Sequence, residues 1–126
     1  IYKRAVTQCL SEREKSDGQF YRGTLKRRQL IESESSIVIL GDVEFGAKVV
    51  AKGNIIILGT LYGSVHAGAA GDRNAFIIAL SMQPQRLVIG DIEAKRQLIY
   101  QDSLSINGPQ IAVVDGKRIY LDPLIE

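Results

Sequence analysis

Residues 37–61 of this 126-residue chain read IVILGDVEFGAKVVAKGNIIILGTL. Within this stretch an apolar residue returns at every sixth position, and the series continues on both sides of it. Its members are Leu25, Ile31, Ile37, Val43, Val49, Ile55, Leu61 and Ala67. A period of six matches neither the 3.6-residue repeat of an α-helix nor the two-residue alternation of a strand. The stretch therefore predicts a repeating architecture.

Small residues follow the same period, two positions before several of these apolar residues. They are Gly41, Ala47, Gly53 and Gly59. Glycine accepts backbone conformations that other residues avoid, so such positions are suited to sharp corners. Three hexads make 18 residues, the spacing at which Leu40–Val43 recurs as Leu58–Leu61. The sequence predicts an all-β fold, a parallel β-helix of triangular cross-section with one hexad on each side.

This coil length also predicts which core residues stack. Residues 18 positions apart should lie above one another, so we expect Val43 between Leu25 and Leu61. By the same rule we expect Val49 between Ile31 and Ala67.

The chain divides into three parts. Residues 1–19 are polar and charge-mixed, and we interpret them as a linker or the end of an upstream segment. Residues 20–126 form the predicted domain, in which residues 68–74 break the period and should form a loop at one corner. Residues 97–126, with a turn at Asp115-Gly116, predict a C-terminal strand or hairpin cap over the last coil.

One side of the prism carries apolar residues outside as well as inside. If Ile37, Ile39, Ile55 and Ile57 face inward, their neighbours along each strand must face outward. The outward set that we expect is Val38, Leu40, Ile56, Leu58, Ile77 and Ala79. Such a patch indicates a protein interface, and a twofold homodimer is the commonest way to bury it. The alternative is that the linker or the C-terminal segment covers it within the chain.

Composition excludes several classes of function. The formal net charge is only +2, and no aromatic residues are interleaved with the basic ones, so we expect no nucleic-acid partner. No apolar run approaches 20 residues, which favours a cytoplasmic protein. With one cysteine and one histidine, His66, the chain lacks the parts of a zinc site or a histidine-activated nucleophile. We expect no catalytic residue, metal or cofactor.

A period of six also describes the left-handed β-helix of hexapeptide acyltransferases. Those enzymes commonly need a catalytic histidine, and His66 keeps this alternative open. The short repeat, the apolar outer face and the predicted cap argue against it. A second alternative, from the class of structural proteins, is a polymerising scaffold that resembles the bactofilins.

Several motifs in the same order resemble the C-terminal domain of the septum-site-determining protein MinC, over residues 20–126. They are Arg22–Leu25, Gly41–Val49, Ala51–Ile55, Gly63–Asp72, Gln83–Asp91 and Pro109–Ala112. The resemblance implies a right-handed β-helix that dimerises through an apolar prism face. It also implies binding to the membrane-associated ATPase MinD and a contribution to antagonising FtsZ assembly. Recruitment to the inner face of the cell membrane would then be indirect, through MinD.

The same resemblance implies where the partners bind. Where the family has Arg-Ser-Gly-Gln on the surface used for MinD, this chain has Lys26-Arg27-Arg28-Gln29, an exposed cationic cluster that fits an acidic partner. Arg28 replaces a glycine that can serve a positive φ or a close backbone approach. The expected partner-binding residues for MinD or FtsZ are Lys26, Arg27, Arg28, Gln29, Asp42 and Tyr62.

Overall fold

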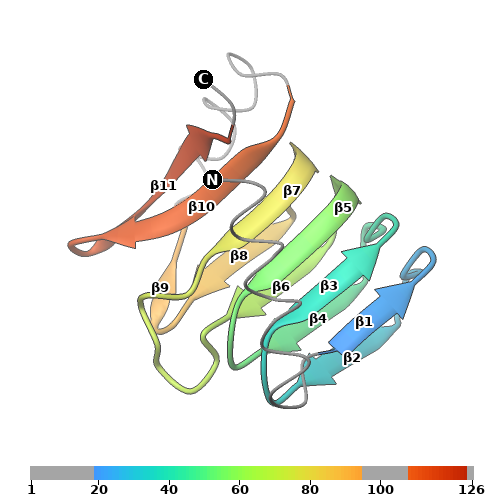
Figure 1. Ribbon diagram of the computed structural model, residues 1–126, viewed down its shortest axis with the longest axis horizontal. Helices are drawn as coiled ribbons and strands as arrows, with labels where there is room; N and C mark the ends of the chain where they lie inside the picture. The colour runs from blue at the N-terminus through green and yellow to red at the C-terminus, as the bar shows by residue number, and fades with distance from the viewer. Residues whose placement is uncertain (1–18, 95–107, 125–126) are drawn as a thin grey trace.

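The computed structural model describes residues 19–94 and 108–124, and within these ranges every regular element is a β-strand (Figure 1). Residues 1–18 of the expected linker, and residues 95–107 and 125–126, lie outside the described residues. The strands are β1 (Gln19–Arg22), β2 (Leu30–Ser33), β3 (Ile37–Leu40), β4 (Lys48–Ala51), β5 (Ile55–Leu61), β6 (Ser64–Ala67), β7 (Ile77–Met82), β8 (Arg86–Ile89), β9 (Ile92–Glu93), β10 (Gln110–Asp115) and β11 (Arg118–Pro123).

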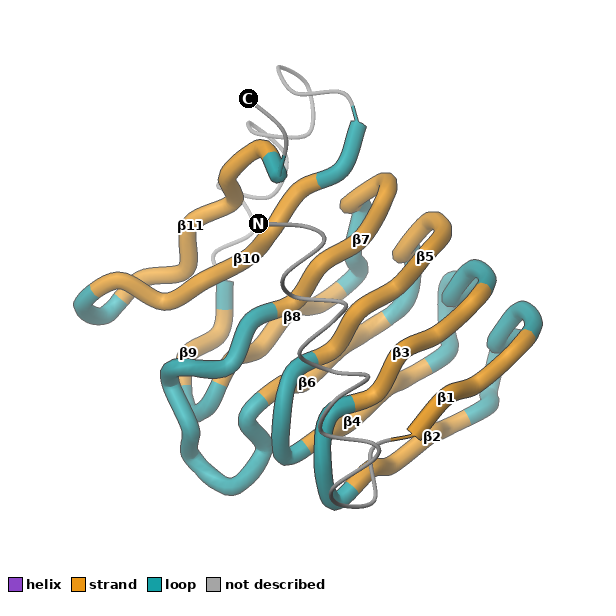
Figure 2. Tube along the Cα trace, viewed as in Figure 1, coloured by secondary structure: helices purple, strands orange, loops and turns teal. Residues whose placement is uncertain are grey.

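The strands form two sheets that the chain visits in turn. One sheet has six strands in the order β1-β3-β5-β7-β10-β11, and the other has five in the order β2-β4-β6-β8-β9. Pairing is parallel from β1 to β7 and from β2 to β8. The third side of the prism is short, with single parallel bridges that join Leu25 to Val43 and Val43 to Leu61. The predicted triangular β-helix is confirmed, and its stacked coils are visible in Figure 2.

The core consists of the inward-facing residues of all three sides. Ile37, Ile39, Ile55 and Ile57 are each at most 1% exposed, as the alternation predicted. The bridges also confirm Val43 between Leu25 and Leu61. Glycines close the first corner because a Cβ at Gly41 would lie against the carbonyl oxygen of Gly23, and one at Gly59 against that of Gly41.

The coil length changes after the second coil. Ile37 pairs with Ile55, 18 positions away, whereas Ile55 pairs with Ile77, 22 positions away. The chain from Val65 to Ile77 is six residues longer than the chain from Val49 to Ile55 in the coil before, and these six residues belong to the predicted loop at residues 68–74, between β6 and β7. At another corner the third coil is two residues short, so Val49 pairs with Val65. The prediction that Val49 stacks on Ala67 was therefore wrong.

Two residues of the expected outward set face inward instead. Ile77 and Ala79 lie in the main core beside Ile55 and Ile57, and both are 0% exposed. The insertion contains an even number of residues, so odd-numbered positions remain inside after it. Ile78 takes the outward position that had been expected of Ile77 and Ala79.

The outer face of the six-stranded sheet is apolar, as predicted, and much of it is covered within one chain. Its central residues, Val38, Ile56 and Ile78, are at most 1% exposed and form a second cluster with Leu124 from the C-terminal segment. Partly buried residues that pack against this cluster are Phe20, Leu40, Leu58, Phe76 and Ile111. The cover within the chain that we considered as an alternative is therefore present in part.

The predicted cap is a hairpin. Strands β10 and β11 pair antiparallel, and β10 also pairs antiparallel with β7, so the hairpin extends the six-stranded sheet at one end of the solenoid (Figure 1). Asp115 pairs with Arg118, which leaves Gly116 and Lys117 as the two-residue loop. Gly116 has φ of 67°, which confirms the predicted turn at Asp115-Gly116.

Candidate partner-binding surface

The turns that follow β1, β3, β5 and β7 stack along one edge of the solenoid (Figure 2). We call residues 26–29, 44–47, 62–63 and 83–85 the corner ridge. Backbone hydrogen bonds join successive turns: the amide of Arg28 donates to Gly46 O at 3.0 Å, and the amide of Glu44 donates to Leu25 O at 2.9 Å. The amide of Gln85 donates to Tyr62 O at 3.1 Å. The ridge is thus a continuous, hydrogen-bonded part of the solenoid.

The first turn of the ridge carries a strained residue. The amide of Gln29 donates to Lys26 O at 2.9 Å and closes the turn, while the side-chain Oε1 of Gln29 accepts from the amide of Lys26 at 2.6 Å. Arg28 has φ of 71°, and it is the one non-glycine residue with positive φ in the described ranges. Glycine adopts this left-handed conformation without the steric cost that a side chain adds.

Three cations project from this turn. Lys26, Arg27 and Arg28 are exposed, and in the described part of the chain none of them forms an ion pair. Glu44, on the next turn of the ridge, is acidic and also exposed. The ridge therefore presents a positive surface that can pair with carboxylates of a partner.

The structure places Asp42 and Tyr62 beside this turn. Asp42 O accepts from the amide of Leu25 at 2.8 Å, so Asp42 lies one coil along from Thr24, as expected. Its carboxylate accepts from the amide of Thr60 at 2.8 Å and holds the next coil in place. Tyr62 is 44% exposed and lies one coil beyond Glu44. All six expected partner-binding residues thus gather at one corner.

Sequence reasoning missed Phe45 as a member of this surface. Its side chain is 63% exposed, more than any other large hydrophobic side chain in the described residues. The signal lay in the spacing, because four residues separate Val43 from Lys48 whereas only two separate Leu61 from Ser64. The shorter third turn leaves the second turn uncovered, and Phe45 projects from it.

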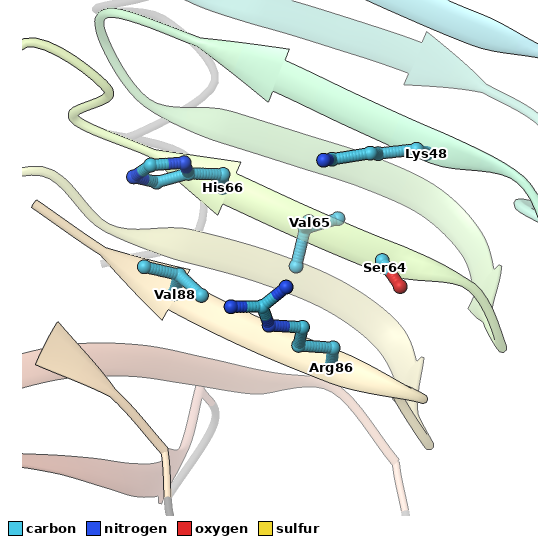
Figure 3. A pocket seen from close by; sticks show the side chains of 6 residues that line it. All are labelled: Lys48, Ser64, Val65, His66, Arg86 and Val88. Carbon is cyan, nitrogen blue, oxygen red and sulfur yellow. The ribbon is translucent and has the colours of Figure 1, made fainter.

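A second surface feature lies on the outer face of the five-stranded sheet. A cleft of about 250 Å³ is lined by Lys48, Ser64, Val65, His66, Arg86 and Val88, which come from three neighbouring strands (Figure 3). His66 Nε2 lies 2.8 Å from Gly90 O; because a carbonyl only accepts, Nε2 carries the hydrogen. The guanidinium of Arg86 is paired with Glu93 at 2.7 Å. Among the described residues, no nucleophilic side chain of the cleft is hydrogen-bonded to His66.

Within residues 19–94 and 108–124, no three histidine, cysteine, aspartate or glutamate side chains are grouped so that they could hold a metal ion. Among the same residues, none forms a helix that is long and apolar enough to cross a membrane.

Comparison with known proteins identifies a family. Residues 19–124 match the family model described as septum formation inhibitor MinC, C-terminal domain. A curated relative, the probable septum site-determining protein MinC of Agathobacter rectalis, is 46% identical over 84% of this chain and 47% of its own length. The Aquifex aeolicus protein of the same name is 42% identical over 90% of this chain and 55% of its own length. The chain spans about half the length of these relatives.

A solved structure shares the fold. A chain from the MinC:MinD cell division protein complex of Aquifex aeolicus superposes with a TM-score of 0.77 at 39% sequence identity. The match covers 86% of this chain and 87% of the other.

Proposed function

This chain belongs to the family of MinC C-terminal domains, and we propose that it is a non-enzymatic adaptor that couples a division inhibitor to the ATPase MinD. In this role it helps to block FtsZ assembly at the wrong sites in the cell. Support comes from the relatives, which are named probable septum site-determining proteins, and from a similar solved chain that belongs to a MinC:MinD cell division protein complex.

The observation that carries the proposal is the cationic turn of the corner ridge. Lys26, Arg27 and Arg28 are exposed and unpaired among the described residues, at the position of the family's MinD-binding motif. A charge-assisted hydrogen bond contributes about 1.5–3 kcal/mol, so two or three such bonds to carboxylates of MinD supply a specific contact. Gln29 holds the turn closed through its hydrogen bond to Lys26 and so positions the cations.

The proposal includes a homodimer formed through the outer face of the six-stranded sheet. The central residues of that face are already buried within one chain. The row beside them keeps exposed area, because Leu40 and Leu58 are half-buried and Leu80 is 36% exposed. We place the dimer contact on this row. Two copies would present two ridges to MinD on a membrane, so the second contact would form at a high effective concentration.

Membrane association in this proposal is indirect. A cytoplasmic adaptor is brought to the inner face of the cell membrane by MinD, which itself holds the lipid contact. The alternative of a hexapeptide acyltransferase has little support, because His66 Nε2 is engaged by Gly90 and family membership points elsewhere.

Co-sedimentation with MinD on lipid vesicles tests the proposal. We expect this chain to sediment with MinD and vesicles when ATP is present, and much less with ADP. Lys26→Glu with Arg27→Glu should abolish sedimentation, because the two introduced carboxylates would repel the carboxylates of MinD with which the cations are proposed to pair. Lys117→Glu with Arg118→Glu is the matched control, since it makes the same change of net charge at the exposed hairpin loop.

The outcomes separate the alternatives. Equal sedimentation of the ridge variant and the parent would place the MinD surface elsewhere. A parent chain that never sediments with MinD would refute the adaptor proposal. End-to-end filaments of this chain alone in electron micrographs would favour the bactofilin-like scaffold over a discrete dimer.

A further inference from the structure

Phe45 is an exposed aromatic side chain beside the cationic turn. Five large hydrophobic side chains are exposed in the described residues, and Phe45, at 63%, is the most exposed of them. Two of the others, Leu30 at 53% and Tyr62 at 44%, lie on the corner ridge or directly after its first turn. Apolar surface is therefore concentrated where the unpaired cations are.

The backbone that carries Phe45 is held in place from both sides. The amide of Ala47 donates to Glu44 O at 3.0 Å and closes its turn. From the fourth coil, Gln85 Oε1 accepts from the amide of Gly46 at 3.2 Å, across the gap left by the short third coil. The backbone of such a braced turn loses little conformational freedom when a partner covers it.

Arg27 lies next to Phe45 across the first two turns. A Cβ at Gly46 would lie 2.8 Å from Arg27 Cγ, so the stem of Arg27 crosses the turn immediately beside Phe45. Aromatic and arginine side chains are the residue types enriched at the energetic centres of interfaces. The ridge thus combines an apolar tip with cations around it.

We propose that Phe45 is an aromatic anchor that inserts into an apolar pocket, rimmed by carboxylates, on the ATPase to which the ridge docks. This inference rests on the proposed function and adds to it the chemistry of the partner's surface. The acidic rim follows from charge complementarity with Lys26, Arg27 and Arg28, and the apolar pocket follows from the exposed ring.

Binding of purified variants to MinD on vesicles with ATP tests the anchor. Phe45→Ala should weaken binding about 30-fold, the typical effect of removing a hot-spot aromatic. Phe45→Leu should recover most of the affinity, because it refills the pocket. Tyr120→Ala is the matched control: Tyr120 is 42% exposed on β11, outside the ridge, and its loss should leave binding unchanged.

Salt dependence gives a second, independent readout. The loss of affinity for MinD caused by Phe45→Ala should stay nearly constant as the salt concentration rises, because salt does not screen apolar contacts. The loss of affinity caused by Lys26→Glu with Arg27→Glu should shrink as the salt concentration rises, because salt screens interactions between charges. Melting temperatures of Phe45→Ala and the parent should agree, since the ring is mostly exposed.

The outcomes distinguish this inference from the proposal beneath it. If the parent binds MinD and Phe45→Ala binds equally well, the anchor is refuted while the adaptor function stands. If the parent does not bind, both fall. If Phe45→Ala changes the oligomeric state and not MinD binding, the ridge is a contact between copies of this chain and the anchor is again refuted.

Discussion

At the scale of single residues, the corner ridge shows a conflict between backbone geometry and side-chain chemistry. Arg28 occupies a left-handed conformation with φ of 71°, whereas Gly46, one coil along, meets the same demand as a glycine with φ of 88°. A non-glycine residue in this conformation costs about 1–2 kcal/mol. The chain tolerates this cost at a position where a cation faces solvent.

We predict that Arg28→Gly stabilises the fold. Relief of the left-handed strain, partly offset by the greater freedom of glycine in the unfolded chain, should raise the free energy of unfolding by about 0.5–1 kcal/mol. Urea unfolding followed by circular dichroism measures this change. Arg27→Gly is the matched control, because it removes the same side chain from a position without positive φ and should not stabilise. An Arg28→Gly protein that unfolds at lower urea than the parent would contradict the strain argument.

The same residue shows what sequence could predict at this scale. The glycine in the family motif suggested either a positive φ or a close backbone approach at Arg28, and the observed φ of 71° agrees with the first of these. Phe45 was not predicted as a site residue, because its exposure depends on a turn two residues shorter in the next coil. A side chain's exposure is set by what neighbouring coils leave uncovered, and a periodic pattern does not record that.

At the scale of elements, an ion pair joins the loop at residues 68–74 to the next coil. Arg73 Nε donates to Asp91 Oδ1 at 2.7 Å and Arg73 Nη2 donates to Asp91 Oδ2 at 2.8 Å, a bidentate contact that ties the loop to the turn after β8. The hydrogen bonds from Arg73, with a further one from the backbone amide of Asp91, lower the pKa of the Asp91 carboxyl to about 2. The sequence predicted the loop but not its partner, because the contact spans 18 residues across two coils.

We predict that this pair stabilises the fold only above acidic pH. The folded pKa of Asp91 lies below its ordinary value of 3.8, so the stabilisation is present above about pH 4 and is lost as pH falls through about 2. Carboxyl-carbon NMR titration should show Arg73→Ala returning the pKa of Asp91 toward 3.8. Thermal unfolding of the parent and of Arg73→Ala should differ at neutral pH and converge near pH 2.

The control for this prediction makes the same change of charge at a position away from Asp91. Arg118→Ala removes a cation from the cap hairpin and should leave the pKa of Asp91 low. A low pKa of Asp91 in the Arg73→Ala protein would show that the backbone hydrogen bond alone is responsible.

At the scale of the whole molecule, the six-residue period was sufficient to predict the architecture. The period specifies three sides and 18 residues per coil, and Ile37–Ile55 and Leu25–Val43 pair accordingly. The period failed to predict the pairing where coils change length, because the shortened turn before Ala67 and the insertion at residues 68–74 shift the register without changing the local pattern. It also could not show how far one chain covers its own apolar face.

That partial cover determines where a dimer contact can form. Ile56 is 0% exposed within one chain, so Ile56→Lys would bury an unpaired charge and destabilise the subunit itself by several kcal/mol. Leu58 is half-buried and Leu80 is 36% exposed, and both follow the aligned pair Ile57–Ala79 on neighbouring strands. A charge at either position can reach solvent in a monomer but not in a dimer.

We therefore predict that Leu58→Glu with Leu80→Glu gives a folded monomer. Burial of a leucine side chain contributes about 1.5–3 kcal/mol, and two like charges brought together across a twofold axis repel each other, so the dimer constant should weaken by more than about 100-fold. Sedimentation velocity measures the mass, and circular dichroism checks the fold. Leu30→Glu is the matched control, because Leu30 is 53% exposed on β2 of the other sheet and its change should leave the dimer intact. A double variant that stays dimeric would show that copies of this chain meet through another surface, leaving the row of Leu40, Leu58 and Leu80 to be covered in some other way.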